Sequence, residues 1–111
     1  MDRSDFLGHI RRTRFAPGDR ENAQADARRI ADFLRAQGAT RVVGIGSAFA
    51  PHRRFTKRSD IDLMVEDLPP RRFFRVLAEA ANMTAFELDL TPAESATDYM
   101  RQAVDEEGVD L

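Results

Sequence analysis

The sequence has 111 residues, a mass of 12.6 kDa and a formal net charge of −2 at pH 7, which suits one domain spanning residues 1–111. Hydrophobic residues make up 42% and charged residues 32%, which excludes a wholly disordered chain, and no apolar run approaches the roughly 20 residues that span a bilayer. Cysteine is absent, which excludes disulfides and cysteine-type zinc sites, and the charged N-terminal residues do not form a secretory signal, so we expect a cytosolic protein.

The first part of the chain is expected to be helical. Apolar residues at helical spacing predict a short helix over residues 2–14, and with the turn that follows it forms an N-terminal addition, residues 1–18. A second helix is predicted from Asp19, as its N-cap, to about Gln37, before Gly38. Its apolar stripe consists of Ala23, Ala27, Ile30, Phe33 and Leu34.

Three strands and two further helices are predicted after this. Strands are expected within residues 41–47, 60–66 and 86–90, with a partly basic loop over residues 48–58. A helix should follow Pro70, with apolar residues Phe73, Phe74, Val76, Leu77 and Ala80, and a last helix should run from Pro92 to about Glu107. This order predicts a small α/β (α+β) domain with a mixed three-stranded sheet flanked by helices. The first two strands should be antiparallel, and the helix that follows allows the second and third to be parallel.

Three aspartates are the candidate catalytic and metal-binding residues. Asp60 and Asp62 are two residues apart on a predicted strand, so their side chains should share one face while Ile61 and its alternating neighbours face the core. If the third strand lies beside the second, Asp89 joins them. Clustered carboxylates repel one another unless a cation lies between them, and oxygen ligands suit Mg²⁺. Three carboxylates can hold two such ions for a phosphoryl displacement.

The candidate phosphate-binding residues lie between the first two strands. Gly46 and Ser47 close the first strand, where a glycine allows a phosphate to approach the backbone and a hydroxyl can donate a hydrogen bond. Residues 1–58 carry 13 Lys/Arg against 6 Asp/Glu, whereas residues 59–111 carry 4 against 13. The basic half can attract phosphates, and the candidates for gripping a triphosphate are Arg53, Arg54, Lys57 and Arg58.

Each of these features is common by itself on solvent faces and in turns, but their joint order is far more specific. The chain resembles a minimal nucleotidyltransferase of the DNA polymerase beta-like superfamily. That family has a hydrophobic strand ending in Gly-Ser, then Asp-x-Asp about ten residues later, and a third Asp. The matching positions are Gly46, Ser47, Asp60, Asp62 and Asp89, and the C-terminal EEGVDL, residues 106–111, is similar to the Glu-Gly-Val end of many members. The resemblance covers roughly residues 20–111.

The stretch after Ser47 departs from the family pattern. Members often continue Gly-Ser with x-Ala-Arg-Gly, whereas this chain has Ala48-Phe49-Ala50-Pro51 and lacks both the Arg and the Gly. Pro51 stiffens the loop, and Arg53 or Arg54 is a candidate substitute for the missing Arg. The departure affects the expected binding of phosphates and leaves the three carboxylates unchanged.

The resemblance implies a fold with a polymerase-beta-like core and the transfer of AMP from ATP to a hydroxyl, with Mg²⁺ as cofactor. Asp60 and Asp62 would hold one ion, a second would be shared with Asp89, and Asp89 is also a candidate base. Because the chain has little beyond the core, the acceptor is expected on a partner. Stand-alone members resemble antitoxins that modify a tyrosine of a HEPN-type helical toxin.

Other functions remain open from the sequence. The altered stretch after Ser47 favours a binding subunit or antitoxin that has lost transfer, and a homo-oligomer acting on a small aminoglycoside-like molecule is a further alternative. The acidic second half, and a basic loop without interleaved aromatic residues, make nucleic acid a poor primary substrate.

Overall fold

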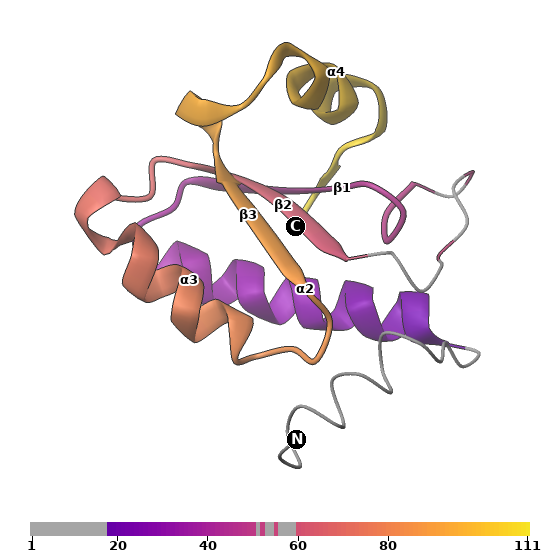
Figure 1. Cartoon of the computed structure of the whole chain (residues 1–111), viewed down its shortest axis with the longest axis horizontal. Helices are drawn as coiled ribbons and strands as arrows, with labels where there is room; N and C mark the ends of the chain where they lie inside the picture. The colour runs from indigo at the N-terminus through magenta and orange to yellow at the C-terminus, as the bar shows by residue number, and fades with distance from the viewer. Residues whose placement is uncertain (1–17, 51, 53–54, 56–59) are drawn as a thin grey trace, which may run out of the picture.

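The computed structural model describes residues 18–50, 52, 55 and 60–111, so the helix expected over residues 2–14 lies outside the described residues. The helices are α2 (Asp19–Ala36), α3 (Phe73–Ala81) and α4 (Asp98–Glu107), with short 3₁₀ turns η1 (Pro70–Arg72) and η2 (Ala93–Ser95). The strands are β1 (Arg41–Ile45), β2 (Ile61–Glu66), β3 (Leu88–Pro92) and β4 (Val109–Asp110) (Figure 1).

The strands form one mixed sheet in the order β3-β2-β1-β4. Strand β1 is antiparallel to β2, and β2 is parallel to β3, which confirms both predicted directions. The predicted count of three strands was wrong, because the two residues of β4 pair antiparallel with Val43 and Gly44 of β1. A strand of two residues is too short to show an alternating pattern in the sequence.

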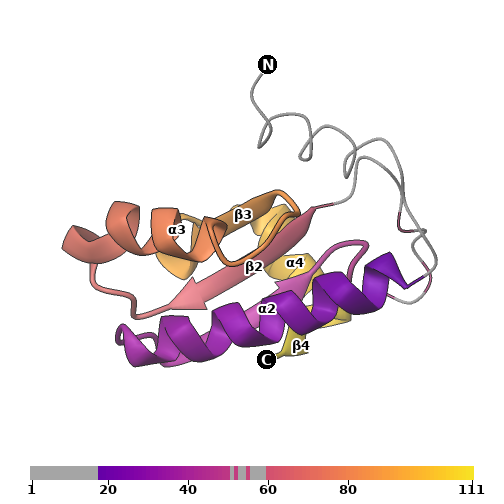
Figure 2. The same ribbon diagram turned by 90° about the horizontal axis from the view of Figure 1, so that it is seen from below.

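Helices cover both faces of the sheet. Figures 1 and 2 show α2 and α3 side by side on one face and α4 on the other. The face under α2 and α3 carries the larger core, which includes Ile61, Leu63 and Val65 of β2, all fully buried as expected. The α4 face holds a smaller cluster of Val43, Ile45, Met64 and Val104. None of the helices in the described part of the chain has the length and apolar character needed to span a membrane.

Helix α2 follows its predicted apolar stripe but begins differently. Asp19 is the first helical residue rather than the N-cap, and Gly18 precedes it with φ 92° and no side-chain cap. Near the other end, Gly38 donates its N–H to the carbonyl of Arg35, and the N–H of Ala39 bonds to Leu34. These two bonds form a Schellman motif, which confirms that Gly38 ends the helix.

The later elements depart from their predicted bounds. Strand β3 is shifted by two residues and reaches Pro92, which lies opposite Val65 at the end of an edge strand, where the absent N–H is tolerated. The last helix begins at Asp98 rather than Pro92, because the Thr97 hydroxyl caps it by accepting from the Met100 N–H. Phe74, predicted among the apolar residues of α3, is 81% exposed.

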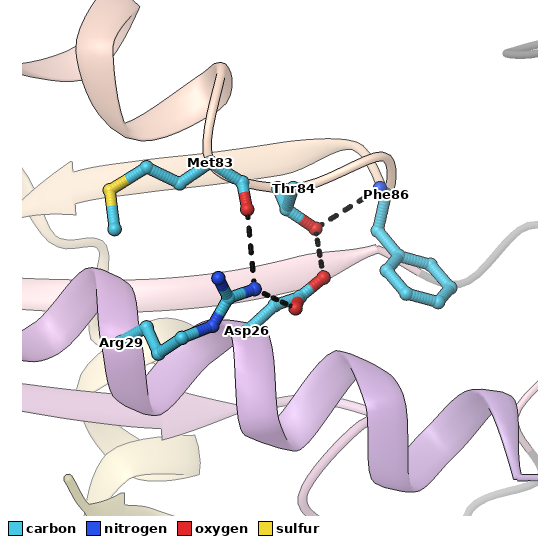
Figure 3. A network of polar contacts seen from close by, with 5 residues as sticks. All are labelled: Asp26, Arg29, Met83, Thr84 and Phe86. Atoms are coloured by element: carbon cyan, nitrogen blue, oxygen red, sulfur yellow. Dashed lines mark hydrogen bonds and ion pairs between the residues drawn. The ribbon is translucent and has the colours of Figure 1, made fainter.

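A polar network ties α2 to the chain just before β3 (Figure 3). The Thr84 hydroxyl donates to Asp26 Oδ2 at 2.7 Å and accepts from the N–H of Phe86 at 3.2 Å. Arg29 pairs with the other carboxylate oxygen of Asp26 and donates to the carbonyl of Met83 at 3.4 Å. The network therefore positions the segment that leads into β3.

Replacing Thr84 by valine should lower stability, because valine has no hydroxyl. The variant loses the hydrogen bond to Asp26 and the one from the Phe86 N–H, and only Arg29 still contacts Asp26 in this network. We expect a loss of about 1 kcal/mol in the free energy of unfolding, the size of one or two partly buried hydrogen bonds. Urea denaturation of the wild type and Thr84→Val measures it directly, with Thr84→Ser, which keeps the hydroxyl, as the control. Equal midpoints for wild type and Thr84→Val would contradict the prediction.

Candidate active site

The sheet brings the predicted carboxylates together at one end. Asp62 of β2 lies directly opposite Asp89 of β3 in the parallel register, and Asp60 immediately precedes β2. The residue opposite Asp62 on its other side is Ile45, the last residue of β1. Ile45 and its cross-strand partner share a face, so Asp62 and Asp89 lie on the face that carries α4. The adjacency expected of the three aspartates is present.

Burial and mutual repulsion both disfavour ionisation of these carboxyls. The pKa of Asp62 is raised to about 6, first by burial and then by the negative charges of Asp89 and Asp60. The pKa of Asp60 is also raised, first by burial and then by Asp89 and Glu87. A cation bound beside these carboxyls would offset their repulsion and favour their ionised form.

One oxygen at this site supports the same conclusion. Asp62 Oδ1 is buried and accepts no hydrogen bond within the part of the chain that the structure describes. A buried carboxylate oxygen without a donor is costly, and coordination of a hard cation would satisfy it. Among the described residues, however, no three carboxylate or imidazole groups converge closely enough to enclose one ion. Asp60, Asp62 and Asp89 thus suit an open site whose remaining ligands would come from phosphate oxygens and water.

The predicted phosphate-binding turn follows β1 directly. The carbonyl of Gly46 accepts from the N–H groups of Phe49 and Ala50 at 3.1 and 2.8 Å, which folds residues 46–50 into a tight turn that begins beside Asp62. Gly46 has φ 79°, a conformation that L side chains rarely adopt. A Cβ on Gly46 would lie 3.7 Å from the Cβ of Asp62, so the glycine is required by its backbone angle rather than by lack of space.

The turn rests on the core through its apolar residues. Ala48 and Ala50 are fully buried, and the ring of Phe49 covers Gly44 of β1. A Cβ on Gly44 would lie 2.5 Å from Cε2 of that ring. Ala50, which stands where the family often has Arg, therefore packs into the protein, whereas Ser47 is only half-buried.

One contact to this turn, and one to His52 just beyond it, were not predicted from the sequence. Gln24 of α2 donates its side-chain amide to the Ala48 carbonyl at 2.7 Å, and His52 Nε2 lies 3.4 Å from Glu107 Oε1 at the end of α4. Both contacts join residues far apart in the sequence, and no local pattern indicates them. The four basic candidates, Arg53, Arg54, Lys57 and Arg58, lie outside the described residues.

Solved structures with a similar fold include toxin–antitoxin complexes. A mutant toxin–antitoxin complex containing MntA matches with a TM-score of 0.61 and 19% identity, over 76% of this chain and 70% of that chain. The chain has the minimal nucleotidyltransferase fold. A complex of a tri-AMPylated HEPN toxin with its MNT antitoxin, from Shewanella oneidensis, matches with a TM-score of 0.58 and 22% identity, over 79% and 70% of the two chains.

A third complex supports the same fold assignment. A toxin–antitoxin structure with AMP-PNP matches with a TM-score of 0.60 and 21% identity, over 76% of this chain and 70% of that chain. No protein-family model and no curated protein matches the sequence. These matches confirm the expected resemblance to minimal nucleotidyltransferases at the level of the fold.

Proposed function

We propose that this chain is an antitoxin-type nucleotidyltransferase that transfers AMP from ATP to a hydroxyl, a tyrosine, on a partner HEPN-type toxin. The observation that carries the proposal is the placement of Asp62 opposite Asp89, with Asp60 adjacent, beside the Gly46–Ser47 turn. The neighbours support the chemistry, since one contains an AMPylated HEPN toxin and another contains AMP-PNP. The mutant complex among them carries two aspartate-to-glutamate substitutions two residues apart, the spacing of Asp60 and Asp62.

Each residue of the site has a role in this reaction. The turn at Gly46 and Ser47 would bind the triphosphate through backbone N–H groups and the serine hydroxyl. Asp60 and Asp62, with Asp89, would hold Mg²⁺, which when bound neutralises phosphate charge and lowers the pKa of the attacking hydroxyl. The acceptor oxygen forms a bond to the α-phosphorus, the bond to the β-phosphate bridging oxygen breaks, and pyrophosphate leaves. The acceptor proton passes to the carboxylate of Asp89.

Transfer is tested with ATP labelled at the α-phosphate, MgCl₂ and a co-purified HEPN-type partner. We expect the label to appear on the partner with wild-type protein and to be lost with Asp62→Asn, by at least about a hundredfold, because the substituted amide cannot ligate the cation as a carboxylate does. Glu66→Gln, which removes a carboxylate farther along β2, is the matched control and should retain transfer. Labelling by Asp62→Asn at the wild-type rate would overturn the proposal.

The same experiment distinguishes a binding subunit without transferase activity. The burial of Ala48, Phe49 and Ala50, with Ala50 where the family often has Arg, is the observation that favours that alternative. A stable complex with the partner, without labelling by wild type, is the result expected of a chain that binds but does not transfer.

A further inference from the structure

Helices α2 and α4, from distant parts of the chain, contact the turn that carries Ser47 and His52 just beyond it. On one side, the side-chain amide of Gln24 in α2 donates to the carbonyl of Ala48 at 2.7 Å. Ala48 is fully buried, so its carbonyl depends on a protein donor, and this bond reaches across 24 residues of sequence. The hydrogen bond from Gln24 therefore fixes the position of the turn relative to α2.

On the other side, the end of α4 contacts the residue two positions beyond the turn. Glu107 Oε1 lies 3.4 Å from His52 Nε2, and the Glu107 side chain is only 19% exposed. A carboxylate in the last turn of a helix is disfavoured by the helix dipole, and the His52 imidazole is the group that the structure places beside this one. In the sequence His52 directly precedes Arg53 and Arg54, two of the basic candidates for phosphate binding.

The C-terminal segment fixes Glu107 in place. A Cβ on Gly108 would lie 2.4 Å from the Val104 carbonyl oxygen and 2.8 Å from Val43 Cγ1, so only glycine allows α4 to end so close to β1. The next residue, Val109, then pairs with Gly44 of β1, the strand that leads into the turn. The EEGVDL end of the chain thus places a partly buried carboxylate beside His52.

We propose that Gln24 and Glu107 are positioning residues for ATP, which hold the Gly46–Ala50 turn and His52 from opposite sides and thereby place the phosphate-binding groups opposite Asp62. This inference rests on the proposed nucleotidyltransferase function. Neither residue needs to touch the nucleotide, because phosphate binding by a tight turn depends on the directions of its N–H groups, which small displacements change.

The test is calorimetric titration of the full-length chain with ATP in the presence of MgCl₂, for wild type, Gln24→Met and Glu107→Gln. Methionine keeps the length of Gln24 but removes its donor, and glutamine keeps the shape of Glu107 but removes its charge. We expect each variant to weaken ATP binding about tenfold. In transfer assays with the partner, KM for ATP should rise by a similar factor while kcat at saturating ATP changes by less than about twofold.

Two control variants separate positioning from a general loss of stability. Thr97→Ala removes the capping hydroxyl at the start of α4, and Glu106→Gln makes the same charge change one residue before Glu107, on an exposed side chain. Both variants should bind ATP with wild-type affinity. Thr97→Ala also shows whether a lowered Tm by itself changes ATP affinity.

The outcomes distinguish the two proposals. Wild-type affinity in Gln24→Met and Glu107→Gln, or losses of affinity that simply follow Tm as in Thr97→Ala, would overturn the positioning roles and leave the proposed function standing. Failure of the wild-type chain to bind ATP, either alone or with its partner, would overturn both.

Discussion

Replacing Asp62 by asparagine is expected to stabilise the protein at pH 8 in the absence of divalent cations. In the wild type, burial and the neighbouring Asp89 and Asp60 raise the pKa of Asp62 from 3.8 to about 6. A raised carboxyl pKa means that the folded state binds the proton more tightly than the unfolded state does. Its ionisation therefore opposes folding above pH 6, and stability is regained as the pH falls from about 6 toward 4.

The expected size follows from the pKa. The rise in the pKa from 3.8 to about 6 corresponds to about 3 kcal/mol in the free energy of unfolding. Because Asp62 is partly exposed, solvent screening reduces this to about 1–2 kcal/mol. For a domain of this size the Tm of Asp62→Asn should exceed that of the wild type by about 5 °C at pH 8. The difference should shrink as the pH falls below 6 and disappear near about pH 3, where the wild-type carboxyl is largely protonated in both the folded and the unfolded state.

Thermal melts across about pH 3–8 measure this effect, with Glu66→Gln as a control for removal of a carboxylate from the same strand. Added MgCl₂ should raise the Tm of the wild type at pH 8 and leave that of Asp62→Asn unchanged, because only the wild type offers a carboxylate there. A wild-type Tm that exceeds the variant's at pH 8 without MgCl₂ would show that Asp62 is stabilised in its charged form, contrary to the prediction.

Replacing Gly44 by alanine is expected to destabilise the protein through a clash next to the site. The added Cβ would lie 2.5 Å from Cε2 and 2.7 Å from Cζ of Phe49, whose ring is buried and cannot simply swing away. Overpacking of this kind costs about 1–3 kcal/mol, whereas the entropy gained by replacing glycine is about 0.4–1 kcal/mol. The net effect should be a loss of about 1–2 kcal/mol of unfolding free energy.

The same change should reach the active site, because displacement of Phe49 moves the turn that carries Ser47. ATP affinity should therefore fall together with stability. Urea denaturation of Gly44→Ala, Phe49→Leu and the double variant tests the contact, since leucine removes the ring atoms that the new Cβ would strike. We expect the double variant to be more stable than the sum of the single losses, and strict additivity would refute the steric explanation.

Local pattern in the sequence was sufficient to predict most of the framework. The apolar stripe of α2, its end at Gly38 and the alternation of Ile61, Leu63 and Val65 depend on residues close together in the chain, where helical and extended periodicities act directly. The same alternation places Asp60 and Asp62 on one face. The start of the last helix was misjudged because Pro92 belongs to β3, and the cap at Thr97 has the stronger local bond.

The properties that make the aspartates a candidate site came only from the tertiary structure. Which residue of β3 lies opposite Asp62 depends on the register of two strands separated by a helix, and the raised pKa depends on atoms that other elements bring around the carboxyl. The amide bond from Gln24, the approach of Glu107 to His52 and the short strand β4 are likewise contacts between distant segments. Sequence periodicity thus determined which residues of the strands face the larger core and which face the other way. Long-range packing decided how close the three aspartates lie to one another and how far each is exposed to solvent.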